Sequence, residues 1–133
     1  KLTGANSAIK TGQEIPSLTK TARMPDNPDS VNPVHEDEYA KLYDLRGALI
    51  GGPTLLSLVM EMLFLYFGPN WFYHGKIKTS FIGGGAIDGD ELIAHGKITG
   101  VNSEREGTRV ELDVWLENQK QEKIVVGQAS CIK

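Results

Sequence analysis

The feature that most constrains the fold is a run of almost wholly apolar residues from Pro53 to Phe67. Gly51-Gly52-Pro53 opens this run, and Gly68-Pro69 closes it. Proline at the first helical position and glycine just past the last one are typical of the two ends of an α-helix. The run is shorter than the ~20 residues that a helix needs to cross a bilayer. It therefore predicts a core helix that other structure must wrap, because an exposed helix this apolar would promote aggregation.

The few polar side chains of this helix share one stripe. Thr54, Ser57 and Glu61 are spaced three and four residues apart, which places them on one side of the helix. Such a stripe is more typical of a subunit interface or a buried polar network than of chemistry. Ser57 stands near the opening glycines and is also a candidate substrate-binding residue.

The residues after the helix alternate in polarity and predict β-strands. The expected strands cover residues 76–81, 91–101, 109–117 and 123–132. In the third, four apolar side chains face one way: Val110, Leu112, Val114 and Leu116. The connections at 102–107 and 118–121 are short and polar, so these strands should pair antiparallel as a meander. With an expected edge strand at 12–23, the pattern indicates an α+β fold.

Length and composition indicate one domain spanning residues 1–133. Of these residues, 40% are apolar and 23% are charged, which is ordinary for a globular protein. The net charge of −3 argues against nucleic-acid binding. The one cysteine, Cys131, cannot form an internal disulfide, which fits a reducing compartment. No signal peptide is visible, so we expect a cytoplasmic protein with no membrane partner.

Neither the histidines nor the glycine run predicts a metal or phosphate site. His74 and His95 lie on predicted strands too far apart in sequence to form a metal pair, so no metal is assigned. Gly83-Gly84-Gly85 lacks the strand–loop–helix context of a phosphate-binding loop, and it predicts a bulge or sharp bend instead.

Several short motifs follow one another along the chain, and their order is informative about its family. They are Gly12 to Pro16; Asn32-Pro33-Val34-His35, with Tyr39-Ala40-Lys41 and Arg46-Gly47 behind it; Gly52; Phe67 to Trp71 with Gly75; and Asp88-Gly89-Asp90. Their order and spacing resemble the MaoC-like family of (R)-specific enoyl-CoA hydratases and dehydratases. The resemblance covers most of the chain. It implies a hotdog fold, in which an antiparallel sheet wraps around a long central helix.

The resemblance also implies a mechanism and its residues. In that family a histidine and an aspartate hold a water that adds to C3 of a trans-2-enoyl thioester, and the N–H of the helix-opening glycine polarises the thioester carbonyl. By motif position, His35 of the Asn32 motif is the expected base. Gly52 is the expected oxyanion donor, with Gly51 beside it in the substrate site. An imidazole can accept the proton of water, and an amide at a helix N-terminus stabilises the developing enolate. No cofactor is implied.

The chain departs from the family pattern at three positions. Ser30 stands five residues before His35, where the family has its catalytic aspartate. Asp29 is adjacent and is the nearest candidate for the missing acid. Gly51 replaces a histidine at the helix entrance, and Gly85 replaces a proline before the Asp-Gly-Asp turn. The scaffold is thus preserved better than the acid–base pair.

Three functions remain open at this point. The first is a lyase: a hydratase or dehydratase acting on an acyl thioester of CoA or of an acyl carrier. The second is a catalytically silent hotdog subunit of a heteromeric hydratase, which the loss of the aspartate would suit. The third is an acyl-CoA thioesterase, which needs a carboxylate near the central helix, where Glu61 is the one acid. In each case we expect a homodimer or a heterodimer with another hotdog subunit.

Overall fold

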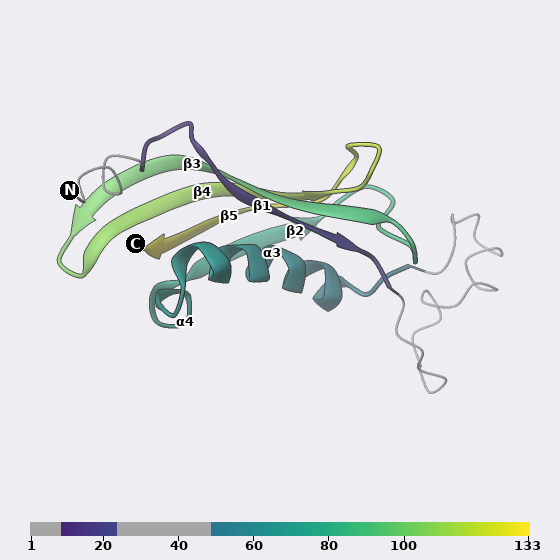
Figure 1. Ribbon diagram of the computed structural model, residues 1–133, viewed down its shortest axis with the longest axis horizontal. Helices are drawn as coiled ribbons and strands as arrows, with labels where there is room; N and C mark the ends of the chain where they lie inside the picture. The colour runs from purple at the N-terminus through teal and green to yellow at the C-terminus, as the bar shows by residue number, and fades with distance from the viewer. Residues whose placement is uncertain (1–8, 24–48) are drawn as a thin grey trace.

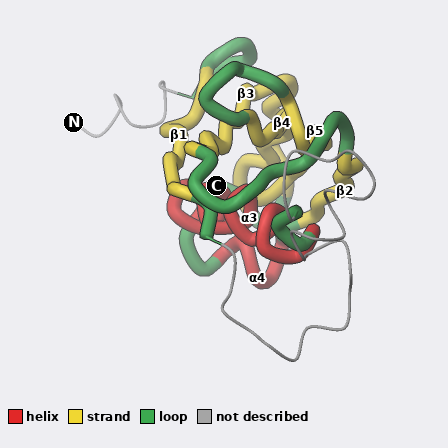
Figure 2. The backbone as a smooth tube through the Cα atoms, turned by 90° about the vertical axis from the view of Figure 1, so that its right-hand side faces the viewer, coloured by secondary structure: helices red, strands yellow, loops and turns green. Residues whose placement is uncertain are grey.

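The computed structural model describes residues 9–23 and 49–133 of the chain. Its helices and strands, labelled as in Figure 1, are β1 (Glu14–Thr21), α3 (Gly52–Phe67), α4 (Asn70–His74), β2 (Lys76–Phe81), β3 (Glu91–Glu104), β4 (Gly107–Glu117) and β5 (Lys123–Ile132). The five strands form one antiparallel sheet in the order β1-β3-β4-β5-β2. Figure 2 shows this sheet arching over α3.

The central helix begins at Gly52, just before the predicted start at Pro53, and ends at Phe67 as predicted. Gly51 is the N-cap residue in an extended conformation, and Pro53 stands in the first turn. Gly68 ends α3 with a φ of 68°, and its N–H donates to the Phe64 carbonyl oxygen at 2.7 Å. Glycine adopts this left-handed conformation without the steric cost that a Cβ would impose.

One face of α3 packs against the inner face of the sheet. Its buried residues are Leu55, Val59, Met62, Leu63 and Phe67. Opposite them are the four apolar residues of β4 that the alternation predicts to face one way: Val110, Leu112, Val114 and Leu116, each at most 1% exposed. Burying apolar surface in this layer is the main source of the stability of the fold.

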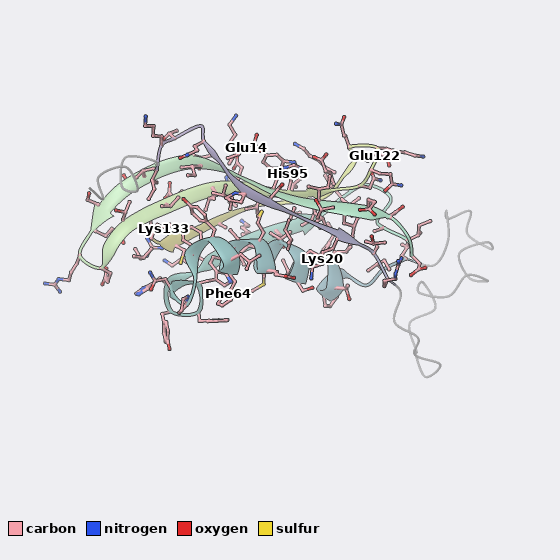
Figure 3. All side chains as sticks on the ribbon, in the orientation of Figure 1. Glu14, Lys20, Phe64, His95, Glu122 and Lys133 are labelled. Atoms are coloured by element: carbon pink, nitrogen blue, oxygen red, sulfur yellow. The ribbon has the colours of Figure 1, made fainter. Side chains whose placement is uncertain are left out.

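The predicted wrapping of the helix is incomplete within the part of the chain that the structure describes. Phe64 is 37% exposed on the side of α3 away from the sheet, as Figure 3 shows, and Leu65, which lies near Pro16 and Leu18 of β1, is 65% exposed. Phe64 instead contacts Phe72 of α4, with ring centroids 5.1 Å apart. Aromatic and aliphatic groups left open in this way are typical of surfaces that a partner covers.

The meander of β3, β4 and β5 is confirmed; β3 and β4 are longer than expected, whereas β5 spans the predicted residues. The β3–β4 connection is a tight turn at Arg105 and Glu106, because Glu104 already pairs with Gly107. Gly107 has a φ of 143°, a value that favours glycine. The polar residues on both sides of the turn still pair as strand residues. A loop predicted from polarity alone is therefore longer than the real one.

The two outer strands pair with partners that are distant in sequence. β1 pairs with β3, and its register shifts between Ile15 and Leu18, where Pro16 interrupts the strand. Proline has no N–H to donate, and it is tolerated here because β1 is an edge strand. β2 pairs with β5 without a register shift, from Lys76 to Phe81, and forms the other edge.

The expectation that His74 lies on a strand is wrong. His74 is the last residue of the short helix α4, whereas His95 lies on β3 as predicted. The aromatic run before His74 has a high strand propensity, but buried Trp71 anchors these residues beneath the end of α3. Gly75 caps the end of α4, and a Cβ there would collide with the Trp71 ring and carbonyl oxygen.

Candidate active site

The expected site has two halves, and the structure describes one of them. His35, Asp29, Ser30 and Asn32 lie outside the described residues, so their roles stay predictions. The other half is the N-terminus of α3, which carries Gly51, Gly52 and Ser57.

The entrance of α3 presents a backbone amide without an acceptor among residues 9–23 and 49–133. The Gly51 carbonyl oxygen accepts hydrogen bonds from the N–H groups of Thr54 at 3.1 Å and Leu55 at 3.2 Å, which close the first turn. The N–H of Gly52 precedes these and has no carbonyl within the helix to bond. It lies at the positive end of the helix dipole, where an oxygen that gains negative charge is stabilised.

The residues just before the helix are held by a second backbone segment. The Ile50 N–H donates to the Ala86 carbonyl oxygen at 2.7 Å. Leu49 forms an antiparallel β-bridge with Ile87. Residues 86–87 therefore fix the position of the segment before Gly51, and this segment in turn fixes the position of the helix N-terminus.

The Asp-Gly-Asp turn holds residues 86–87 in place. Asp90 is 4% exposed, and its Oδ2 accepts the Ile87 N–H at 3.0 Å while its Oδ1 accepts from Gln119 Nε2 at 3.1 Å. Its carbonyl oxygen accepts the Ala22 N–H at 2.7 Å, which ties the end of β1 to the same turn. Sequence reasoning read this motif as a turn and missed the buried carboxylate that organises it.

Phe81 is the described side chain that lies against Gly52. A Cβ placed on Gly52 would stand 3.1 Å from Phe81 Cζ and 3.4 and 3.5 Å from its Cε atoms. The tip of the ring thus occupies the space beside the helix entrance. Phe81 ends β2 and remains 54% exposed. Alternation in the sequence indicates its face of the strand but not this contact between two elements.

The polar stripe of α3 makes two local interactions. Ser57 is exposed, and its hydroxyl donates to the Thr54 carbonyl oxygen at 2.7 Å, one turn back. Glu61 pairs with Lys20 of β1, with Oε1 and Nζ 3.1 Å apart. Both partners of this pair are more than two-fifths exposed, so its contribution to stability is at most about 1 kcal/mol.

A second polar cluster lies on the opposite face of the sheet. The His95 ring stacks on Trp115, with centroids 5.2 Å apart, and its Nε2 lies 3.4 Å from Glu117 Oε1. Trp115 Nε1 donates to the same oxygen at 3.0 Å, and Glu14 stands 3.9 Å from Nδ1. Figure 3 shows Glu14 and His95 on the side of the sheet away from α3. The cluster is therefore separate from the helix entrance.

Neither the single thiol nor a metal cluster supplies an alternative site in the described part. Cys131 is fully buried, and burial raises the pKa of its thiol, so it is a poor nucleophile. Its Sγ–H donates to the Asn70 carbonyl oxygen at 3.3 Å. No three His, Cys, Asp or Glu side chains gather as metal ligands within residues 9–23 and 49–133. None of the helices described there is long and apolar enough to cross a membrane.

Comparison with solved structures decides the fold. An (R)-hydratase from A. caviae, involved in PHA biosynthesis, superposes with a TM-score of 0.73 over 94% of this chain and 97% of its own, at 19% identity. The chain has a hotdog fold. The R-hydratase PhaJ1 from Pseudomonas aeruginosa gives a TM-score of 0.73 over 95% of this chain and 83% of its own, at 18% identity. A chain of the ChsH1-ChsH2 complex from Mycobacterium tuberculosis gives a TM-score of 0.71 over 92% of this chain and 97% of its own, at 15% identity.

The hotdog assignment confirms the predicted architecture, and identities this low support the fold alone. No family model matches the chain, and no curated protein matches its sequence. In this hotdog domain α3 is the central helix and Gly52 its first residue. The α+β prediction and the hotdog prediction from the motifs are therefore confirmed, while the roles of individual residues remain predictions.

Proposed function

We propose that this protein is a hydratase or dehydratase acting on an enoyl or 3-hydroxyacyl thioester of CoA or of an acyl carrier. The observation that carries the proposal is the Gly52 amide, which opens the central helix of a hotdog fold and has no acceptor among the described residues. The (R)-hydratases named above share this fold. An amide in this position is suited to a substrate whose carbonyl oxygen gains negative charge during the reaction.

The chemistry requires an oxyanion donor, a base and an acid. In hydration, a water oxygen bonds to C3 of the enoyl thioester, the C2=C3 electron pair moves toward the carbonyl, and the Gly52 N–H stabilises the resulting enolate oxygen. His35 takes the proton of the attacking water, and an acid returns a proton to C2. Dehydration is the same sequence in reverse. Asp29 is the candidate acid, because Ser30 stands where the family has its aspartate.

The direct test is hydration of crotonyl-CoA and longer enoyl-CoAs, followed as loss of the absorbance of the conjugated enoyl thioester. We expect turnover that needs no added metal or cofactor. Absence of turnover on every chain length, with a partner hotdog protein restoring it, would instead establish the silent subunit. That alternative is favoured by one observation, the serine at position 30.

The thioesterase alternative receives less support from the geometry. Glu61 lies roughly 14 Å along the helix axis from Gly52, at 1.5 Å per residue. Its carboxylate is engaged by Lys20 at 3.1 Å. A carboxylate there is not beside the amide that would polarise the thioester carbonyl. Hydrolysis of acyl-CoA, measured as thiol release, should therefore stay at background.

Restoring the family acid tests whether the pair of residues 30 and 35 does the chemistry. We expect Ser30→Asp to raise kcat for crotonyl-CoA, by up to about 10²-fold if the native chain lacks an efficient acid. Asp29→Asn is the companion variant. A loss comparable to that of a His35 variant would show that Asp29 already supplies the acid, and Ser30→Asp would then bring no gain. If neither substitution changes kcat, residues 29 and 30 do not take part.

We also propose that the protein is at least a dimer, with the acyl pocket at the subunit interface. Within residues 9–23 and 49–133, β2 is an edge strand that keeps an even register from Lys76 to Phe81, and no described strand pairs with its outer backbone groups. The exposed apolar side chains of α3, Phe64 and Leu65, can also be covered by a second copy of the chain in an isologous contact. Sedimentation or light scattering at micromolar concentration should give a dimeric mass, and a monomeric mass would contradict the proposal.

A further inference from the structure

Phe81 has a position that its role in the core does not explain. It is the last residue of β2, and its ring tip lies close to Gly52, the first residue of α3, although more than half of its surface is open. A large aromatic side chain normally stabilises a fold by burying its apolar surface, and Phe81 buries less than half of its own. Its neighbour Ile82 is 40% exposed as well. The tip of this half-exposed ring therefore lies close to Gly52, the residue whose amide the proposed function assigns to the substrate carbonyl.

We propose that Phe81 is a positioning and specificity residue of the enoyl-thioester site. This inference rests on the hydratase or dehydratase function proposed above. The ring forms an apolar wall beside the Gly52 amide, and the acyl group lies against that wall while its carbonyl oxygen accepts from the amide.

The distances place the wall close to the reacting atoms. A Cβ on Gly52 would meet Phe81 Cζ at 3.1 Å, so the ring tip lies next to the Gly52 backbone, on the side to which a side chain would project. A carbonyl oxygen bonded to the Gly52 N–H stands about 2.9 Å from that nitrogen. The substrate atoms nearest the ring are then the neighbours of the carbonyl carbon, which are C2 and the thioester sulfur. An apolar group there also lowers the local dielectric constant and strengthens the amide–enolate interaction.

The contact also explains the glycine at position 52. Gly52 is not among the glycines of the described residues with a positive φ, so its backbone does not require glycine. The Phe81 ring crowds the position that a Cβ would take, with its nearest atom 3.1 Å away. Gly52 and Phe81 are therefore complementary in shape, and a substituent at C2 of the acyl group would compete with the ring for the remaining space.

The prediction is a change in selectivity at C2. We expect Phe81→Ala to lower the ratio of kcat/KM for crotonyl-CoA to that for 2-methylcrotonyl-CoA by about 10-fold, the usual worth of one methyl group in an apolar pocket. KM for crotonyl-CoA should rise, because the acyl group loses its wall. Phe81→Leu keeps much of the apolar volume and should recover most of the wild-type ratio.

Phe72→Ala is the matched control. Phe72 is 73% exposed on α4, and Figure 1 shows α4 at the end of α3 opposite to Gly52. Its loss should leave both the ratio and KM within about twofold of wild type, the scale of a surface substitution. Circular dichroism of all three variants separates a folding defect from a local change in the site.

The outcomes separate the two proposals. If wild type hydrates crotonyl-CoA and Phe81→Ala keeps its KM and its selectivity, the wall is overturned while the enzyme stands. If Phe81→Ala and Phe72→Ala shift the ratio equally, the effect is general and the wall is again overturned. If wild type neither hydrates nor binds crotonyl-CoA in calorimetry, the proposed function fails, and the role of Phe81 fails with it.

Discussion

His35→Ala should lower kcat for hydration of crotonyl-CoA by about 10²–10⁴-fold, the usual contribution of a positioned general base. The base takes the proton of the attacking water, and without it the water must attack as a neutral molecule. The Gly52 amide is untouched by this change, so binding of the thioester should persist and KM should move little. Initial rates across substrate concentration measure both quantities.

His74→Ala is the control for the loss of an imidazole. His74 ends α4, at the end of α3 opposite to Gly52, and it is its backbone carbonyl that accepts from Arg109 Nη1 at 3.3 Å. We expect His74→Ala to retain wild-type kcat. A His35→Ala variant as active as wild type would remove His35 from the mechanism, and equal losses in both variants would indicate a nonspecific effect.

Gly127→Ala should destabilise the fold by about 3 kcal/mol, at the upper end of the cost of overpacking. A Cβ at Gly127 would collide with the Lys78 carbonyl oxygen and would stand 2.9 Å from Thr79 Cα. These are main-chain atoms of β2, so no side-chain rotation relieves the contact, and β2 must move away from β5. For a domain of this size the melting temperature should fall by roughly 10 °C.

Gly84→Ala provides the matched comparison for that prediction. Gly84 lies in the turn after β2, and a Cβ there meets nothing within 4 Å. We expect a change within about 0.5 kcal/mol, the range of most surface substitutions. Both variants should be melted at the same protein concentration, because association would shift the transition. If Gly127→Ala melts like Gly84→Ala, β2 does not approach β5 as closely as the structure has it.

The elements predicted best from the sequence are those set by local chemistry. Pro53 and Gly68 mark the ends of α3, and the strict alternation in β4 sets its inward face and its C-terminal end. α4 escaped prediction because its aromatic residues favour strands, while burial of Trp71 under α3 decides the outcome. Local propensity is overruled there by a tertiary contact.

The candidate site was predictable to a smaller extent. The glycines and prolines at the helix ends, together with the order of the motifs, were enough to place Gly52 at the helix entrance. The contact between Gly52 and Phe81 joins elements that are distant in sequence, and no periodicity encodes it. The same holds for Asp90, whose acceptance of the Ile87 N–H and the Gln119 amide depends on how two loops meet. The roles expected for His35 and its neighbours rest on the resemblance of their motif to the family.

The oxyanion donor proposed here belongs to the main chain, and this affects how such a protein can evolve. Every residue except proline would supply the amide N–H at position 52, and the backbone bonds of Ile50 and the Asp90 turn keep its place. The proton-transfer groups, in contrast, are side chains that single substitutions remove or restore. A lineage with this scaffold can therefore lose its reaction and recover it without refolding, and the serine at position 30 marks where such a reversal would act.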